Sequence, residues 1–377
     1  MSPVTKATPF LVPTFPSPEA LAASFVEITA SGIFSNNGPA SREFRAGLAE
    51  WLDCPADQIA LVSSGTTGLH LAIQALVDPA RTDVLVASFT FAAGPLVITA
   101  AGLRPIFLDI EPSTWQPNFD QAEAWCSSHG SSLAGILLTS TFGVAVPDIA
   151  RWEALAAEHG VPLVVDSAAG FGSTHEDGEP VGLRGDAEVF SFHATKTLAI
   201  GEGGAVRCRN ASVAATIERL ANFGFDDQRR SIALGTNGKL DELSSKIGSL
   251  QLANLEARLA ARQEILAHYR EGLSSLGVTF QPGAERSALP FVSAALPDPD
   301  QRDAVMVALA AGAIESRSYY NPPVHLHPVF SEATSLPMAS TEDLSSRIIS
   351  LPMNDALAPC EIARICAIVG DVIGPCA

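Results

Sequence analysis

The chain has 377 residues, enough for two domains with sizeable apolar cores, and 47% hydrophobic with 17% charged residues is typical of a globular protein. Its 23 basic and 41 acidic residues give a net charge of −18, which argues against nucleic acid as a partner. The six cysteines are scattered without a Cys-x-x-Cys pair, so we expect no metal site and no disulfide framework, and a protein of the reducing cytoplasm.

Residues 84–103 carry no charge, and this run has the length of a membrane span. It divides internally, however. Val84–Ala87 is strand-like, Ser88-Phe89-Thr90 interrupts the run, and Gly94-Pro95 lies where a strand would give way to a helix. A strand buried on both faces, followed by a core helix, has the same uncharged signature, so we expect no membrane partner. The first ten residues contain one lysine, and the short apolar run Phe10-Leu11-Val12 is flanked by prolines, so the segment does not predict a secretory signal.

Short apolar runs alternate with helical patterns in the first 210 residues. Seven runs have strand length: 59–62, 84–87, 105–108, 135–138, 162–165, 187–192 and 204–207. Apolar residues spaced at i, i+3 and i+4 lie between several of them, for example in 68–76 and 149–157. This alternation predicts βαβ units, and hence a mainly parallel, seven-stranded sheet flanked by helices in a large α/β domain.

The remainder of the chain has a different pattern. Residues 240–276 read largely as a long helical stretch that joins two domains. Beyond it lie strand-like pieces at 289–295 and 315–319 and helical patterns at 302–309 and 358–373. We therefore expect a large domain over residues 1–250, with the N-terminal segment included, and a small α+β domain over 251–377.

Lys196 is one of only four lysines and follows an apolar strand within Ser191-Phe192-His193-Ala194-Thr195-Lys196. The glycine-rich segment Gly201-Glu202-Gly203-Gly204 comes next. An amine on a turn beside hydroxyl and imidazole groups suits a lysine that forms a Schiff base. A solvated surface lysine is the alternative.

Residues 61–70 read as a strand, a small polar turn and the start of a helix near Thr67. Backbone N–H groups, the helix dipole and two hydroxyls then meet at one point, as a phosphate requires. The segment lacks both the P-loop and the dinucleotide fingerprint, and an ordinary helix cap explains it equally well.

Asp166 ends a predicted buried strand, at the edge where ligands bind in open α/β sheets, although a helix cap is again an alternative. Pyridoxal 5'-phosphate needs a lysine for its aldehyde, an acid for its ring nitrogen and a cup for its phosphate. Phe91, just past another strand, could stack on the ring, unless it belongs to the core. One cofactor would therefore use every one of these features.

These motifs resemble, in order and over nearly the whole chain, the pyridoxal-phosphate-dependent sugar aminotransferases of the DegT/StrS type, which have the aspartate aminotransferase fold (fold type I). The matching pieces are Ser31-Gly32-Ile33-Phe34 with Gly38-Pro39, Ser64-Gly65-Thr66, Thr90-Phe91, Asp166-Ser167-Ala168, Ser191 to Lys196, Glu202-Gly203-Gly204, Asn237, and Tyr320 with His325.

The resemblance implies a role for each matching residue. Lys196 would bond to the cofactor and later move a proton, and Asp166 would keep the ring nitrogen protonated. Phe91 would cover the ring, Asn237 would reach the partner's phosphate in a homodimer with shared active sites, and Tyr320 and His325 would lie on the substrate side. The implied phosphate ligands are Gly65, Thr66, Thr67 and Ser191.

The implied reaction is a ping-pong transfer of an amino group, from an amino acid such as L-glutamate to a keto group of a nucleotide-linked deoxysugar. Ala169 departs from the family, which commonly has Gln or His there, near the phenolic oxygen of the cofactor. Alanine offers that oxygen no hydrogen bond. A keto-cyclitol or other small ketone as substrate, or a non-catalytic regulatory protein, are the alternatives; the retained lysine argues against the family's dehydrases, which have histidine there.

Overall fold

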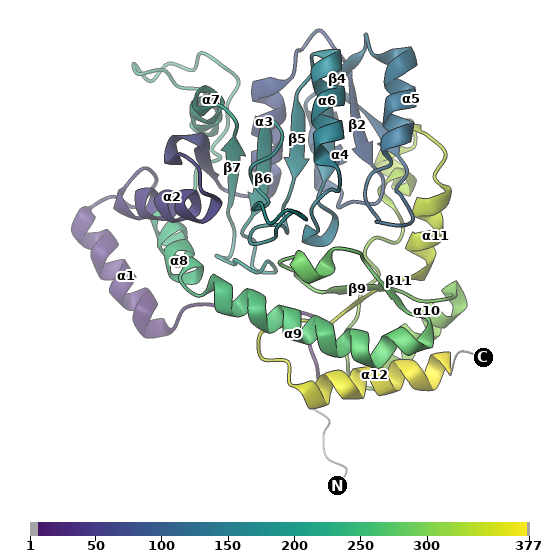
Figure 1. Cartoon of the computed structure of the whole chain (residues 1–377). Coiled ribbons are helices and arrows are strands. Elements are labelled where there is room, and N and C mark those ends of the chain that lie inside the picture. The colour runs from purple at the N-terminus through teal and green to yellow at the C-terminus, as the bar shows by residue number, and fades with distance from the viewer. Residues whose placement is uncertain (1–6, 375–377) are drawn as a thin grey trace.

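An eight-stranded sheet forms the centre of the larger part of the molecule in the computed structural model, which describes residues 7–374 (Figure 1). Its order is β1-β7-β6-β5-β4-β2-β3-β10, and only β7 runs antiparallel to its neighbours. The strands are β1 (Ile59–Val62), β2 (Asp83–Ala87), β3 (Arg104–Leu108), β4 (Leu133–Thr139), β5 (Leu163–Asp166), β6 (Ala187–Ser191), β7 (Gly204–Cys208) and β10 (Thr334–Ser335). The seven predicted strands and their mainly parallel arrangement are confirmed. The two-residue β10 adds an eighth strand at the edge of the sheet, which no sequence pattern predicts.

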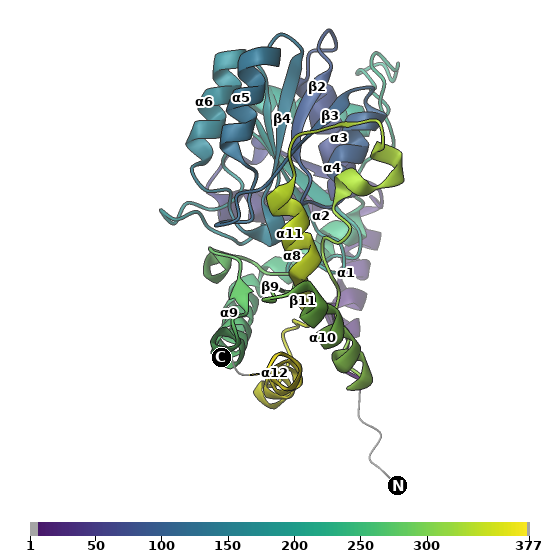
Figure 2. The same ribbon diagram turned by 90° about the vertical axis from the view of Figure 1, so that its right-hand side faces the viewer.

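Twelve α-helices of the described chain surround this sheet and a smaller one. They are α1 (Pro18–Ser31), α2 (Pro39–Leu52), α3 (Gly65–Leu76), α4 (Ala93–Ala100), α5 (Phe119–His129), α6 (Ile149–His159), α7 (Ala211–Ala221), α8 (Glu242–Leu252), α9 (Leu255–Leu273), α10 (Pro299–Ala311), α11 (Ala339–Arg347) and α12 (Pro359–Ile373). Figure 2 shows α5 and α6 on one side of the large sheet and α3 and α4 on the other. No helix among residues 7–374 is both long and apolar enough to cross a bilayer.

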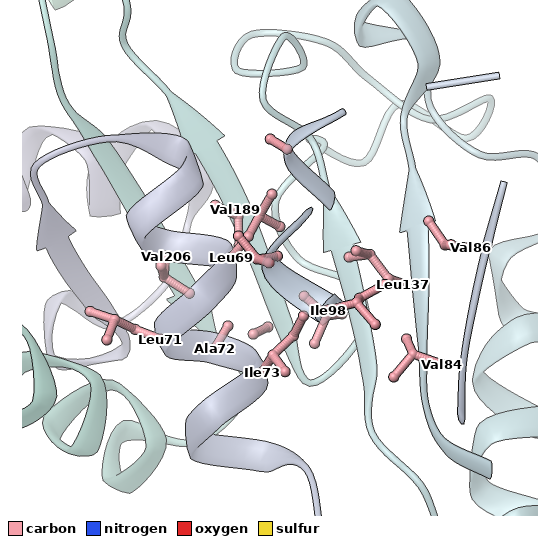
Figure 3. Close-up of a cluster of buried hydrophobic side chains, with 14 of the residues drawn as sticks. Leu69, Leu71, Ala72, Ile73, Val84, Val86, Ile98, Leu137, Val189 and Val206 are labelled. Atoms are coloured by element: carbon pink, nitrogen blue, oxygen red, sulfur yellow. The ribbon is translucent and has the colours of Figure 1, made fainter. Parts of the chain in front are cut away.

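The uncharged run at residues 84–103 is a strand followed by a helix. Val84 and Val86 of β2 pack in the cluster that contains side chains of α3, α4 and α7 (Figure 3). Leu85 between them packs on the opposite face with α5 and α6. Both faces of β2 are therefore covered, which explains why this segment needs no polar residue.

A second, three-stranded antiparallel sheet has the order β11-β9-β8. Its strands are β8 (Thr279–Phe280), β9 (Val292–Ala295) and β11 (Ile348–Leu351). Side chains of α9, α10 and α12 share one buried cluster with this sheet. The predicted α+β character of the later part of the chain is confirmed, whereas the division into residues 1–250 and 251–377 stays a prediction.

Two details of the sequence interpretation differ from the structure. The helical stretch at 240–276 is interrupted at residues 253–254, between α8 and α9, and ends in a short 3₁₀ turn. Residues 315–319 were expected to be a strand, but only Arg317 pairs, with Ser350 of β11. The pairing stops there because the chain turns at once, with the Asn321 N–H donating to the Ser318 carbonyl at 2.7 Å.

Candidate active site

A cavity of about 430 Å³ lies at the carboxyl edge of the large sheet. Residues at or just after the ends of β1, β2, β4, β5 and β6 line it, as expected for an open, mainly parallel sheet. Its opposite wall contains Phe142, just after β4, and residues from distant parts of the chain: Leu11, Pro290, Phe291, Tyr319 and Tyr320. The cavity thus lies between the large sheet and segments from both the N-terminal and the later parts of the chain.

Lys196 and Asp166 both line this cavity. The turn that carries Lys196 is held by backbone hydrogen bonds, including Lys196 N–H to the His193 carbonyl at 2.9 Å. Burial lowers the pKa of Lys196, and the Asp166 carboxylate partly opposes this shift. Burial raises the pKa of Asp166 to about 6, against the Ala168 N–H, which donates to Oδ1 at 3.1 Å, and the charge of Lys196. An amine and a carboxyl group whose charged forms are both destabilised therefore face one cavity.

The start of α3 forms a cup at the same cavity. Ser64 precedes the helix, and its hydroxyl accepts from the Thr67 N–H at 3.0 Å, while Gly65 and Thr66 line the cavity. N–H groups in a first helical turn have no partner within the helix and bear its positive dipole end, so they are available to an anion. A Cβ atom on Gly65 would come within 2.9 Å of the Ser191 Cβ, so only glycine fits against the end of β6.

Thr67 does not line the cavity. Its hydroxyl lies 3.1 Å from the Ser63 Oγ and 3.0 Å from the Ser64 Oγ, so it holds the turn together. The cup that the structure presents to the cavity consists of Ser64, Gly65, Thr66 and Ser191.

Phe91 is 62% exposed and lines the cavity, so it is not a core residue. Tyr320 also lines the cavity and stacks on Phe142, with ring centroids 5.2 Å apart. Burial raises the pKa of the Tyr320 phenol, as does the nearby Asp166 carboxylate, so this hydroxyl stays protonated. An aromatic side chain and a phenolic donor are thus available to a bound molecule.

Two of the residues singled out in the sequence lie elsewhere. The His325 Nδ1 is 2.6 Å from the Ser88 Oγ and its Nε2 is 3.4 Å from Glu342, behind the end of β2 and outside the cavity lining. Asn237 accepts a hydrogen bond from the Lys239 ammonium at 2.6 Å and also lies outside the lining. Within a single chain, the structure does not bring either residue to the cavity.

Several cavity residues were not singled out in the sequence. Thr139 ends β4 as Asp166 ends β5, and Ser140 follows at once, so the rule that located Asp166 would also have located them. Leu11, Phe291 and Tyr319 carry no such signal, because only tertiary packing brings them to the cavity.

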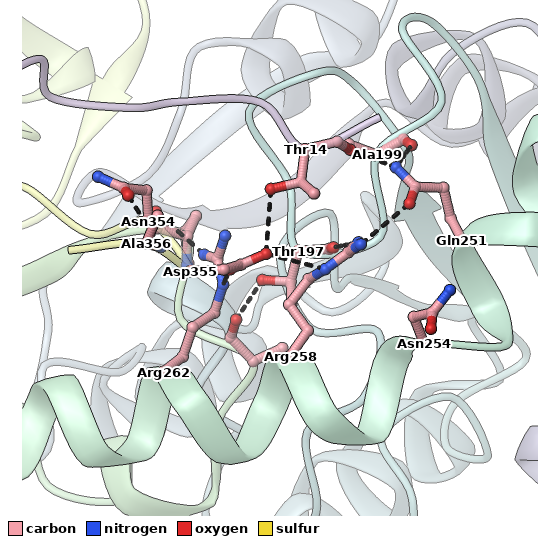
Figure 4. Close-up of polar contacts among 12 residues, drawn as sticks. Thr14, Thr197, Ala199, Gln251, Asn254, Arg258, Arg262, Asn354, Asp355 and Ala356 are labelled. Atoms are coloured by element: carbon pink, nitrogen blue, oxygen red, sulfur yellow. Dashed lines mark hydrogen bonds and ion pairs between the residues drawn. The ribbon is translucent and has the colours of Figure 1, made fainter. Parts of the chain in front are cut away.

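A buried polar cluster supports the Lys196 turn from behind (Figure 4). From α9, Arg258 donates to the Thr197 carbonyl at 3.0 Å, and Arg258 and Arg262 each lie 3.0 Å from the Asp355 carboxylate. Asp355 also accepts from the Thr14 hydroxyl at 3.1 Å. Removing Asp355 would leave the two buried guanidinium groups without their counterion, so we regard the cluster as a rigid support for the turn.

These residues fit pyridoxal phosphate. An amine and a carboxyl group line the cavity between the cup and an aromatic side chain, and the close approach of Gly65 to Ser191 keeps side chains out of the cup. Lys196 and Asp166 would hold the two ends of the ring, while the first turn of α3 and Ser191 would hold the phosphate.

Comparisons with known proteins match nearly the whole chain. The sequence profile of the DegT/DnrJ/EryC1/StrS aminotransferase family matches residues 18–370. Protein Rv3402c of Mycobacterium tuberculosis is 44% identical over 96% of this chain and 89% of its own length. The dTDP-4-amino-4,6-dideoxy-D-glucose transaminase of Shigella dysenteriae is 26% identical over 86% of this chain and 88% of its own. The structure of DesI in the presence of its TDP-sugar product superposes with a TM-score of 0.87 and 31% identity, covering 97% of this chain and 93% of that one.

Proposed function

Since this chain belongs to the DegT/DnrJ/EryC1/StrS aminotransferase family and is thus an aminotransferase, we propose that it transfers an amino group from L-glutamate to a keto group of a nucleotide-linked deoxysugar. The transfer has two half-reactions, in which the cofactor first takes up and then gives up the amino group. The observation that carries this proposal is the meeting of Lys196, Asp166 and the cup of α3 in one cavity. The Shigella transaminase and DesI, named for nucleotide-sugar chemistry, support the substrate class.

Pyridoxal phosphate, when bound, supplies an electron sink for the carbon that bears the amino group. Lys196 would hold its aldehyde carbon and, once released, would move a proton at the α-carbon of the donor. Asp166 would face the ring nitrogen, and a positive charge there would draw the raised pKa of this carboxyl back down, so that the pair is ionised at neutral pH. Phe91 would cover the ring, and Tyr320 would donate to the substrate.

The phosphate would bind Gly65, Thr66 and Ser191 directly, with Thr67 holding their turn. His325 would support the site through Ser88 rather than touch the substrate.

We further propose that two protomers share their active sites. Asn237 lies outside the cavity of its own chain, on a segment whose Ile232 and Leu234 are 59% and 87% exposed. Two strongly exposed apolar side chains on one segment support an interface there. Asn237 of one protomer would then reach the cofactor phosphate of the other. Among the described residues every cysteine is a free thiol, which supports a reducing cytoplasm as the site of action in aminosugar biosynthesis.

Absorbance spectroscopy of the purified protein tests the proposal directly. A cofactor band in the near-ultraviolet and visible range should shift when L-glutamate is added, because the first half-reaction needs no keto substrate. The Lys196→Ala variant should show neither the lysine-dependent band nor turnover. A wild-type protein that gains no band after incubation with pyridoxal phosphate would refute the proposed chemistry.

A keto-cyclitol or another small ketone remains the second candidate, because one observation favours it. Within the described chain, Lys196 and His193 are the only basic side chains that line the cavity, so its wall offers little to a diphosphate. Thermal melting with a nucleoside diphosphate alone separates the two candidates. A concentration-dependent rise in Tm supports the nucleotide sugar, and an unchanged Tm supports the small ketone.

A further inference from the structure

Glu188 is a carboxylic acid in the middle of the central strand β6, and only 1% of its surface is exposed. The Ser167 hydroxyl donates to its Oε1, and the Arg184 N–H donates to Oε2 at 3.2 Å. A carboxylate this deeply buried is costly unless it is hydrogen-bonded or protonated. The proposed mechanism gives Glu188 no task, although its strand ends at the cup.

A chain of hydroxyl groups joins Glu188 to the cavity. The Ser167 Oγ that contacts Glu188 lies 2.8 Å from the Ser140 Oγ, and Ser140 lines the cavity. The backbone N–H of Ser140 also donates to the backbone carbonyl of Asp166 at 2.9 Å, which fixes the backbone of Ser140 beside that residue. Two serines therefore connect a buried acid to the wall of the candidate active site.

The order of the strands shows which edge of the cofactor this wall would meet. The cup lies after β1 and β6, Asp166 ends β5, and Ser140 follows β4, on the far side of β5 from β6. In pyridoxal phosphate, the phenolic oxygen and the phosphate arm flank the carbon that bonds to lysine, so they lie on opposite sides of the ring axis. With the phosphate in the cup, the phenolic oxygen would face the end of β4. Ala169 has no hydrogen-bonding group to offer there.

Each serine hydroxyl can donate only one hydrogen bond. When Glu188 is ionised, Ser167 donates to it and Ser140 donates to Ser167, so toward the cavity Ser140 can only accept a hydrogen bond. When Glu188 carries a proton, it donates to Ser167, Ser167 donates to Ser140, and the Ser140 hydroxyl donates into the cavity. The proton on Glu188 thus sets the direction of the whole chain.

We propose that Glu188 is a positioning residue that controls, through Ser167, whether Ser140 presents a donor or an acceptor to the phenolic oxygen of the cofactor. This inference rests on the proposed binding of pyridoxal phosphate. A Ser140 donor stabilises the ionised phenolic oxygen, and a Ser140 acceptor stabilises its protonated form.

Burial of Glu188 places this change near neutral pH. Burial raises the pKa of Glu188 to about 7, against the Ser167 hydroxyl, the N–H groups of Arg184 and Gly182, and the charge of Arg207. Arg207 comes from β7, where it pairs in register with Glu188. Arg184 comes from the loop before β6, and its guanidinium is engaged by Glu153 of α6 at 3.2 Å and by Glu179 at 3.3 Å. On the cavity side, beyond Ser167, lie Asp166 and Lys196.

The test is a pH titration of the absorbance of the bound cofactor in wild type, Glu188→Gln and Ser140→Ala, with Thr139→Val as the matched control. Thr139 also lines the cavity at the end of β4, but its hydroxyl contacts Thr90, at 3.0 Å. We expect a spectral step between about pH 6 and 8 in wild type and in Thr139→Val. The step should be absent from Glu188→Gln and from Ser140→Ala, although both still bind the cofactor stoichiometrically.

Infrared difference spectra of the cofactor-free proteins give an independent measurement. Wild type and Ser140→Ala should both lose the carbonyl stretch of protonated Glu188 over the same pH range, while Glu188→Gln should keep only the change that belongs to Asp166, whose pKa is about 6.

A spectral step that persists in Glu188→Gln or Ser140→Ala, or one that Thr139→Val also removes, would overturn the proposal while leaving the proposed function intact. Failure of the wild type to form any cofactor band would instead refute the proposed function, and the role of Glu188 with it.

Discussion

The two sides of the candidate active site are built by different means. The side after β1 and β6 uses backbone N–H groups and a glycine pressed against Ser191, and none of its members titrates near neutral pH. The side after β4 and β5 uses side-chain hydroxyls backed by a buried acid. The first side is a rigid binding site for an anion, whereas the second has two hydrogen-bonding states. Rigid binding and adjustable electrostatics are therefore separated across one cavity.

Lys196 lies where the two sides meet, and its loss should have the largest effect of any substitution. Lys196→Ala should reduce turnover to background and abolish the lysine-dependent absorbance, because no other lysine lines the cavity in the described chain. Lys246→Ala is the control, since Lys246 pairs with Glu27 and Glu43 on the surface. An active Lys196→Ala enzyme would remove the basis of the whole comparison.

The side after β4 and β5 should make the free energy of unfolding depend on pH. The pKa of Glu188 is about 7 in the folded protein against an ordinary 4.5, so between these values the folded state binds more protons than the unfolded state. The stabilisation that this proton provides is complete below about pH 4.5 and is lost as the pH rises through 7.

Relative to Glu188→Gln, wild type should therefore lose on the order of 3 kcal/mol of unfolding free energy between these limits. Urea unfolding of the cofactor-free proteins at pH 5 and pH 8 measures this difference. A constant difference between the two proteins would show that Glu188 does not titrate in this range.

The side after β1 and β6 should not tolerate a larger side chain at Gly65. Gly65→Ala brings a Cβ within 2.9 Å of the Ser191 Cβ, so the cup must widen, and we expect the Kd for pyridoxal phosphate to rise by about tenfold, or about 1.4 kcal/mol. Gly370→Ala in α12 is the control, because its Cβ would meet only an ordinary contact at 3.6 Å. Equilibrium dialysis of both variants gives the comparison, and equal Kd values would mean that the cup is not the rigid binding site described here.

The smallest effect is expected at Asn237, which we propose completes the phosphate site of the other protomer. Asn237→Ala should weaken cofactor binding by about 1 kcal/mol, the worth of one hydrogen bond, and only under conditions in which the protein is dimeric. Sedimentation velocity combined with cofactor titration tests this, with Asn210→Ala before α7 as control. An Asn237→Ala protein that dimerises and binds the cofactor normally would show that the two sites are not shared.

Sequence alone predicts the rigid side better than the adjustable one. Gly65, Thr66 and Ser191 belong to short contiguous motifs, and all three line the cavity as expected. Asp166 and Lys196 follow strands, so the topology of the sheet brings them together.

Glu188 shows why the side after β4 and β5 is harder to predict from the sequence. Its charge interrupts an apolar strand at 187–192, yet nothing local indicates that Ser167 and Ser140 connect it to a cavity. That connection requires the register between β5 and β6, which sequence periodicity does not supply. The apolar wall from Leu11, Phe291 and Tyr319 likewise depends on packing between distant segments.

The buried polar cluster behind Lys196 also bears on how the protein is made. Asp355 receives Arg258 and Arg262, and Arg258 in turn holds the carbonyl next to the lysine. During translation the turn with Lys196 leaves the ribosome long before Asp355 does. Until then, Arg258 and Arg262 have no Asp355 carboxylate to pair with. A nascent chain can complete the large sheet in that interval, but its reactive lysine gains a settled position only when the later segment docks. We therefore expect the site to become active only after nearly the whole chain has folded.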